Sequence, residues 1–232
     1  MKVVKVAVYR TNSKGCSIIY DYLDGKFDVE WVERKDVEQE YIFGFDVIVF
    51  PGGWRHLYDA VVSSRFFYAM HRYMMRGGNY LGICGGAFLA WLLDIARCEM
   101  KYLRLLPYYM YYSATGRKGK VKVMWAEGNS LSENGMQEIA WAAGPYITKS
   151  GLMRAEAFYV EDKTFLPIRG KIAVASGYRW FGRVFLFCPH PEYQCGDGDN
   201  IYLIEKAIEW LAGSECEKQS NTFHLNLLGD YR

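Results

Sequence analysis

The stretch Asn79-Tyr-Leu-Gly-Ile-Cys-Gly-Gly-Ala-Phe-Leu-Ala90 places one cysteine, Cys84, between an apolar run of strand length and a run that can begin a helix. Glycine at Gly82, Gly85 and Gly86 tolerates strained backbone angles and close packing. The pattern predicts a nucleophile elbow, a sharp strand-to-helix turn that presents the cysteine in a cleft. N–H groups at the start of the helix would favour the thiolate, the reactive form. The alternative is a buried free cysteine in a glycine-rich turn.

A second stretch, Val184-Phe-Leu-Phe-Cys-Pro-His-Pro-Glu-Tyr193, ends a predicted strand in one of only 4 histidines. His190 is followed two residues later by Glu192. A cysteine nucleophile needs a base to take its proton, and that base needs a third group to hold its tautomer. We therefore predict a catalytic triad of Cys84, His190 and Glu192. Taken alone, His-Pro-Glu could equally be an ordinary turn at the end of a strand.

A glycine pair follows another short apolar run, in Asp46-Val-Ile-Val-Phe-Pro-Gly-Gly-Trp54. Attack of a thiolate on a carbonyl group produces an oxyanion, which backbone N–H groups stabilise when they already point at it. We expect this oxyanion hole to be formed by Gly52, Gly53 and Gly85. Most Pro-Gly-Gly sequences are only turns, so this motif gains weight from its place directly after a buried strand.

Alternating strand and helix patterns in the first half of the chain predict an α/β three-layer sandwich, in which helices cover both faces of a parallel sheet. In such sheets ligands bind at the carboxyl ends of the strands. The glycine pair, Cys84 and His190 all follow predicted strands, so we expect them to meet at one edge. The predicted strands are residues 2–9, 27–32, 46–50, 80–83 and 183–187, and the predicted helices are residues 18–23, 61–75, 88–96 and 201–211.

The middle of the chain has a different pattern. From about residue 101 to 178, short β-like runs alternate with turns and no clear helix is predicted. We expect one domain of residues 1–212 with a β-rich insertion at about 101–178, followed by a tail of residues 213–232. Tyrosines cluster between Tyr102 and Tyr112, where they could line a pocket, form an oligomer interface or pack over the sheet.

The composition excludes several classes of partner. Lys and Arg number 28 against 26 Asp and Glu, so no strong charge predicts binding to nucleic acid or to an anionic membrane. The apolar run at the start is too short for a signal peptide, and none reaches membrane-spanning length. We expect a cytoplasmic protein whose 6 cysteines are free thiols.

A metal site is the rival interpretation of the second motif. Cys188 and His190 lie two residues apart, and Cys195 and Cys84 could join them. Structural zinc sites usually pair their ligands as Cys-x-x-Cys, and the chain lacks that pairing. We expect neither a metal nor another cofactor.

Taken together, the strand-Pro-Gly-Gly, Tyr-Leu-Gly-Ile-Cys-Gly-Gly-Ala and Pro-His-Pro-Glu motifs resemble the class I glutamine amidotransferase-like superfamily. The resemblance covers most of residues 1–212, and it implies a flavodoxin-like three-layer sandwich with a mostly parallel central sheet. It also implies the family's triad at Cys84, His190 and Glu192, and its oxyanion donors at the Gly52–Gly53 turn and Gly85.

Within that superfamily, the chain is most similar to the amidotransferase-like domain at the N-terminus of eukaryotic-type biotin–protein ligases. The likeness rests on Val6-Ala-Val-Tyr9, Phe50-Pro-Gly-Gly-Trp-Arg-His-Leu-Tyr58, Gly77-Gly-Asn-Tyr-Leu-Gly82 and Ala143-Gly-Pro-Tyr146. The 232 residues leave no room for a ligase catalytic half or a synthase domain. We expect either a homo-oligomer or a ligase or synthase partner on another chain.

One position departs from the amidotransferase pattern. Phe88 stands four residues after Cys84, where these enzymes usually carry a glutamine that helps to hold the substrate. An aromatic ring there should discriminate against free glutamine. We therefore expect a different small-molecule or peptide amide as substrate, with Trp54, Phe88 and Tyr193 as candidate pocket residues.

Three functions remain open. The first is a cysteine-dependent hydrolase or amidotransferase-like enzyme that acts on an amide-type C–N bond. The second is a non-catalytic regulatory or ligand-binding module related to the biotin–protein ligase domain. The third, a PfpI-like intracellular protease, ranks lower. In that group an acidic residue after the first strand contacts the cysteine and a histidine often follows it, whereas here Thr11–Gly15 has no acid and Gly85 follows Cys84.

Overall fold

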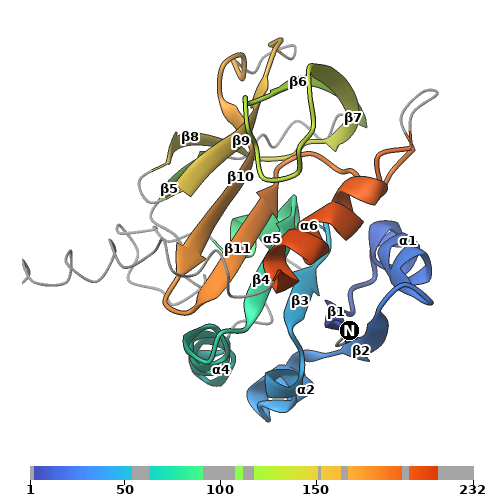
Figure 1. The fold of residues 1–232 in the computed structure, drawn as a ribbon, viewed down its shortest axis with the longest axis vertical. Coiled ribbons are helices and arrows are strands. Elements are labelled where there is room, and N and C mark those ends of the chain that lie inside the picture. The colour runs from blue at the N-terminus through green and yellow to red at the C-terminus, as the bar shows by residue number, and fades with distance from the viewer. Residues whose placement is uncertain are drawn as a thin grey trace, which may run out of the picture.

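The computed structural model describes residues 3–53, 63–90, 108–111, 118–150, 153–162, 167–194 and 199–213. Its centre is a block of five parallel strands in the order β2-β1-β3-β4-β11 (Figure 1). Three of these strands are buried along their whole length, as expected of parallel strands covered on both faces. The five are β1 (Lys5–Tyr9), β2 (Asp28–Val32), β3 (Val47–Phe50), β4 (Asn79–Ile83) and β11 (Gly182–Phe187).

Antiparallel strands continue the same sheet beyond β11. β10 (Ile172–Arg179) forms a hairpin with β11, and β9 (Met153–Tyr159), β6 (Lys118–Trp125) and β7 (Met136–Ala142) follow in that order. Two further strands, β8 (Tyr146–Ser150) and β5 (Tyr108–Tyr111), pair with β10 and with β8 respectively. The predicted α/β class is therefore confirmed, with a mixed sheet that is parallel in the half carrying the candidate site.

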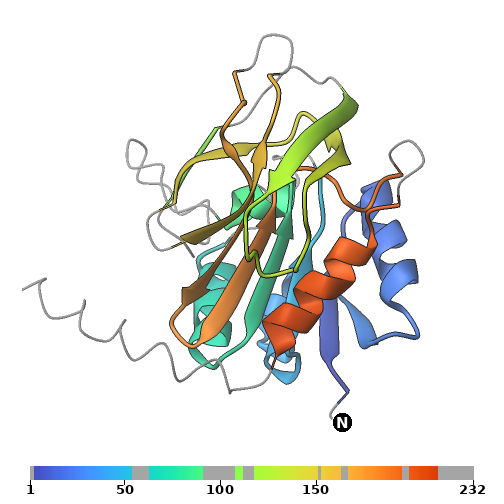
Figure 2. The same ribbon diagram turned by 45° about the horizontal axis from the view of Figure 1, so that its top comes forward.

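Helices lie on both faces of the parallel half. Side-chain hydrogen bonds to Glu205 from Tyr22, at 2.7 Å, and from Lys26, at 2.6 Å, join α1 (Lys14–Leu23) to α6 (Tyr202–Ala212). Ser63, the N-cap of α4 (Ser64–Met75), bonds Glu38 of α2 (Arg34–Glu38) at 2.5 Å. In Figure 2, α6 crosses in front of the parallel strands and α4 lies behind them. The result is three layers.

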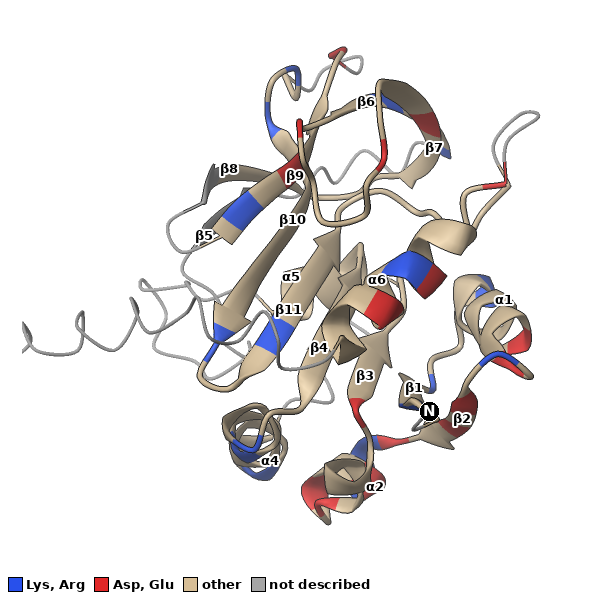
Figure 3. Ribbon diagram, in the orientation of Figure 1, with Lys and Arg blue, Asp and Glu red and all other residues tan. Residues whose placement is uncertain are grey.

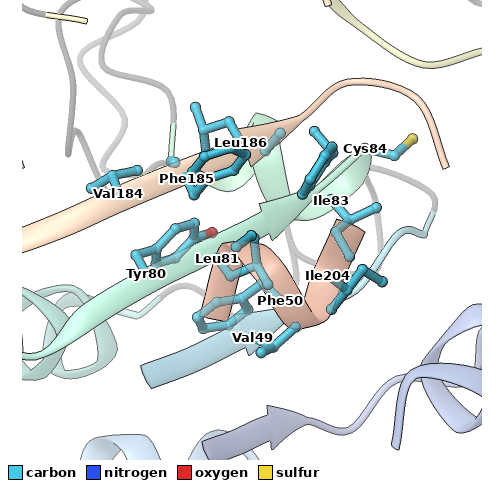
Figure 4. Close-up of a cluster of buried hydrophobic side chains, with 14 of the residues drawn as sticks. Val49, Phe50, Tyr80, Leu81, Ile83, Cys84, Val184, Phe185, Leu186 and Ile204 are labelled. Carbon is cyan, nitrogen blue, oxygen red and sulfur yellow. The ribbon is translucent and has the colours of Figure 1, made fainter. Parts of the chain in front are cut away.

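The core is built mainly from the middle strands and the helices that cover them. Val49, Leu81 and Ile204 of α6 are buried together in the cluster of Figure 4, where Cys84 lies at the end of β4. Phe50 stacks on Tyr80, with ring centroids 5.1 Å apart. β3 and β4 carry no charged residue, whereas the helices and several other strands, including β11, do (Figure 3). None of the described helices has the length and apolar character needed to cross a membrane.

Several short elements were not predicted from the sequence. α2 and the 3-10 helix η1 (Tyr41–Gly44) are too short to show a period, and each buries a single residue. β7 buries three consecutive residues, Ile139, Ala140 and Trp141, so it lacks the expected alternation. The helix after the elbow, α5 (Gly85–Leu89), begins three residues earlier than predicted. The tail from residue 214 lies outside the described residues, as do Tyr102 and Tyr112 of the tyrosine cluster.

Candidate active site

Cys84 occupies the turn between β4 and α5 in a backbone conformation that non-glycine residues rarely adopt, with φ 48° and ψ −101°. Its N–H donates to the carbonyl of Phe187 on β11 at 2.7 Å, and its carbonyl accepts from the N–H of Phe88 at 3.0 Å. One side of the residue is thus tied to the sheet and the other to the helix. Strained residues persist where their surroundings over-determine them, and they cluster at functional sites. The elbow geometry expected from the glycine pattern is present.

The glycines of the elbow allow α5 to pack directly on the turn after β3. A Cβ atom on Gly86 would collide with the carbonyl oxygen of Phe50, and one on Gly85 would collide with the carbonyl oxygen of Gly53. The hydroxyl of Tyr80 helps to hold α5 in this position by donating a hydrogen bond to the carbonyl of Gly86 at 2.7 Å. The backbones of Gly53 and Gly85 therefore lie against each other beside Cys84.

His190 and Glu192 form a buried pair. The Nδ1 atom of His190 lies 2.7 Å from Oε1 of Glu192, and the two residues are 4% and 3% exposed. The N–H of His190 donates to the carbonyl of Ala140 on β7 at 2.8 Å, so the antiparallel half of the sheet helps to place the histidine. A Cβ atom on Gly52 would lie only 2.5 Å from Cε1 of His190. The predicted glycine turn thus packs against the imidazole ring.

Cys84 lies close enough to His190 to influence the charge of its ring. Burial, the largest single influence, disfavours the charged ring, but the interactions with Cys84 and Glu192 together outweigh it. The pKa of His190 is therefore raised well above its ordinary value. This electrostatic arrangement favours a protonated imidazolium ring next to Cys84. The structure brings all three predicted triad residues into one site.

The candidate pocket residues have different positions. The Tyr193 ring stacks on that of His190, with centroids 5.1 Å apart and an interplanar angle of 27°. Phe88 is buried on α5, one helical turn after Cys84. Trp54 lies outside the described residues.

Two neighbours of the site, Gly15 and Tyr159, were not predicted from the sequence. A Cβ atom on Gly15, in the first turn of α1, would lie 2.7 Å from Oε1 of Glu192. Burial, followed by interactions with Cys188 and Cys84, raises the pKa of Tyr159 well above its ordinary range. Burial and the interaction with Cys84 do the same for Cys188. Gly15 follows the first strand, so its position alone could have placed it near the site. Nothing in the sequence around it points to contact with Glu192. Tyr159 lies on β9, and only the pairing of β9 with β10 brings it here.

Metal binding gains no support from the described part of the chain. No group of three or more His, Cys, Asp or Glu side chains there could hold a metal ion. Cys195 lies outside the described residues.

Comparison with known protein families gives one match. Residues 9–102 match the family described as biotin-protein ligase, N terminal. This match includes β4 and Cys84 but ends well before His190 and Glu192. No curated protein sequence matches the chain significantly.

Solved structures share the fold over nearly the whole chain. A protein from Thermoplasma acidophilum, provisionally named as part of a GMP synthase, is 16% identical with a TM-score of 0.64, covering 95% of this chain and 100% of that one. A glutamine amidotransferase is 17% identical with a TM-score of 0.62, covering 90% of this chain and 99% of that one. A β-galactosidase from Bacillus circulans sp. alkalophilus is 12% identical with a TM-score of 0.58, covering 94% of this chain but 31% of that one.

At these identities the structural matches show the fold alone, and one fold can support several activities. The resemblance predicted from the sequence is confirmed: the chain has a glutamine amidotransferase-like fold, and its residues 9–102 match the N-terminal family of biotin–protein ligases.

Proposed function

We propose that this protein is a cysteine-dependent hydrolase or amidotransferase-like enzyme that acts on an amide-type C–N bond. The observation that carries the proposal is the position of Cys84 at a strained elbow, beside a histidine that is itself paired with a buried carboxylate at 2.7 Å. A nucleophile, a base and a group that orients the base are the parts that acyl transfer through a thioester requires.

The residues support a two-step reaction. The Cys84 thiolate attacks the carbonyl carbon of the amide, and His190 gives its proton to the departing amine, leaving a thioester on the sulfur. Water then attacks the thioester while His190 takes its proton, which releases a carboxylic acid and restores the thiolate. Glu192 keeps the ring oriented, since it holds Nδ1. In a transferase, the released ammonia or amine passes to an acceptor on a partner chain.

The oxyanion of each tetrahedral intermediate would be held by backbone N–H groups. Gly85 is the first residue of α5, and the N–H groups of a first helical turn have no partner within the helix. Gly53 lies against Gly85. We assign these two residues, with Gly52 shaping the turn, to the oxyanion hole.

Phe88 supports a substrate other than free glutamine. Its buried ring cannot hydrogen-bond a substrate amide, a loss of about 1–3 kcal/mol for a group left unpaired. We propose a more apolar small-molecule or peptide amide. We also propose a cytoplasmic location, because Cys16, Cys84 and Cys188 are all free thiols.

The test is hydrolysis of amides by the purified protein. A panel of glutamine, asparagine and peptide or aryl amides is incubated with the wild type, with Cys84→Ala and with His190→Ala, and ammonia or amine release is measured. We expect turnover of at least one apolar amide, its loss in both variants and little release from glutamine. Strong Cys84-dependent release from glutamine would show that Phe88 does not control specificity, and activity retained in Cys84→Ala would overturn the mechanism.

The second candidate is a non-catalytic module that regulates or binds a ligand for another protein. The match of residues 9–102 to the N-terminal family of biotin–protein ligases favours it. Under this function Cys84 would have no enhanced reactivity. Alkylation of Cys84 no faster than that of a denatured control peptide would support this candidate against the enzyme.

A further inference from the structure

The first turn of α1 lies directly against the Glu192 carboxylate. A Cβ atom on Gly15 would lie 2.7 Å from Oε1, the same oxygen that bonds Nδ1 of His190, and 3.1 Å from the Tyr193 hydroxyl oxygen. The first approach is closer than side-chain carbons come to other atoms, and the second is tighter than most such contacts. Glycine at this position therefore sets how closely the helix can approach the histidine–glutamate pair.

Tyr193 connects the same helical turn to the imidazole ring. Its hydroxyl lies against the backbone of Gly15, only 3.1 Å from where a Cβ atom would stand, and its ring stacks on His190 with centroids 5.1 Å apart. Burial, helped by the charge of Glu192, raises the pKa of this hydroxyl, so it stays protonated at neutral pH. Gly15 thus contacts both residues that touch the histidine.

The end of α1 is also electrostatically suited to a carboxylate from elsewhere in the chain. Its first turn carries no acidic residue, and the Ser13 side chain makes no capping hydrogen bond. The N-terminus of a helix carries a partial positive charge that stabilises nearby anions. Among the described residues, Oε2 of Glu192 is buried without a hydrogen-bond partner, so its charge depends on His190 and on the end of this helix.

The loop before α1 is itself held in place. The N–H of Thr11 donates to Sγ of Cys16 at 3.3 Å, and the Thr11 and Ser13 hydroxyls are 2.9 Å apart. The Cys16 thiol in turn donates to the carbonyl of Tyr9 at 3.4 Å. These bonds attach the first turn of α1 to the end of β1, which is part of the buried sheet.

We propose that Gly15 and Tyr193 are positioning residues, which hold Glu192 and His190 in the geometry that activates Cys84. This inference rests on the proposed function, because it assigns the N-terminal end of α1 a role in the same site. Neither residue contacts the reacting atoms. Both act through the His190–Glu192 pair, so their loss should change the protonation behaviour of Cys84 and not merely the stability of the protein.

The test measures the rate at which iodoacetamide alkylates Cys84, by mass spectrometry, between pH 5.5 and 9.5. In Gly15→Ala the new methyl group pushes Glu192 away from His190, which weakens the imidazolium and with it the thiolate. An opposite charge at close range shifts a pKa by about one unit or more, so we expect the profile to move upward by about one pH unit. Alkylation at pH 6.5 then slows about tenfold, with little change at pH 9.5.

The controls separate positioning from folding. Gly44→Ala, where a Cβ atom meets nothing within 4 Å, should leave the profile unchanged. Tyr193→Phe removes only the hydroxyl that lies against Gly15 and should shift the profile in the same direction by less. This variant keeps the test valid if Gly15→Ala does not fold. Its matched control is Tyr41→Phe, which removes a surface hydroxyl bonded to Glu30.

The outcomes distinguish this inference from the proposed function. If Glu192→Gln and His190→Ala shift the profile but folded Gly15→Ala and Tyr193→Phe do not, the positioning role is wrong and the triad stands. If none of the four variants shifts the profile, the pair does not act on Cys84 and both proposals are wrong. A shift in all four supports both.

Discussion

At the scale of single residues, burial and charge have opposite effects on the pKa of His190. Burial alone would keep the ring neutral, yet the charges of Cys84 and Glu192 raise its pKa well above the ordinary 6.5. A raised pKa in the folded state means that the protonated ring stabilises the fold. This contribution is complete below about pH 6.5 and is lost as the pH rises through the raised value.

We therefore expect the difference in melting temperature between the wild type and His190→Gln to be largest at pH 5.5–6.5 and to narrow with increasing pH. Thermal unfolding followed by circular dichroism across pH 5.5–9.5 measures it. Gln retains a hydrogen-bonding group of similar size but cannot titrate. A difference that widens toward alkaline pH would contradict the assigned direction of the shift.

The three cysteines of the described residues should differ in reactivity. Burial raises the pKa of Cys16, and burial with the charge of Cys84 raises that of Cys188 much further. A thiol with a raised pKa has little thiolate at neutral pH. We expect Cys84 to be alkylated first at pH 7, as measured by differential alkylation and peptide mass spectrometry. Equal labelling of Cys84 and Cys16 would argue against an activated thiol.

At the scale of elements, the elbow depends on backbone contact between α5 and the turn after β3. Gly86→Ala places a methyl group against the carbonyl oxygen of Phe50, which is backbone and cannot rotate away. Overpacking costs about 1–3 kcal/mol, and in a protein of this size each kcal/mol lowers the melting temperature by about 2–4 °C. Calorimetry should show the lower melting temperature, and mass spectrometry should show slower alkylation of Cys84.

The control for this prediction is Gly119→Ala on β6, where a Cβ atom meets nothing within 4 Å. It should change the melting temperature by no more than about 2 °C, a surface-mutation effect of roughly 0.5 kcal/mol. If Gly86→Ala were as stable as Gly119→Ala, the close contact between helix and turn would not be required for the elbow.

At the scale of the whole molecule, the site depends on both halves of the sheet. Cys84 comes from the parallel half, whereas the His190 backbone is bonded to Ala140 of β7 in the antiparallel half. One continuous sheet links them through the β11–β10 hairpin. We expect the described part of the chain to unfold as one cooperative unit. A destabilising substitution on β7 should therefore also affect the site around Cys84.

Ile139→Ala tests this expectation. Ile139 is fully buried on β7, and its truncation should cost about 2–5 kcal/mol. Denaturant unfolding followed by circular dichroism and by Cys84 accessibility should give coincident curves with a lowered midpoint. Met136→Ala, on the same strand but 56% exposed, is the control and should have little effect. Two separate transitions would show that the halves unfold independently.

The sequence alone predicted the five strands and the longer helices of the parallel half, and it pointed to Cys84, His190 and Glu192 as the residues of the site. These features were predictable because each depends on neighbouring residues: an apolar run, a glycine that permits a strained or crowded backbone, a histidine at a strand end. α2 was missed because a single buried residue gives no period, and β7 because its three buried residues are consecutive and do not alternate.

Only the tertiary structure decided which distant residues support the site. Gly15 contacts Glu192, and Ala140 holds His190, although the partners in each pair are far apart along the chain. No local pattern encodes either contact, because each arises from the order in which strands pair and from how closely a helix packs. The sequence therefore determined the chemical groups of the site, and the packing of the sheet and α1 decided their geometry.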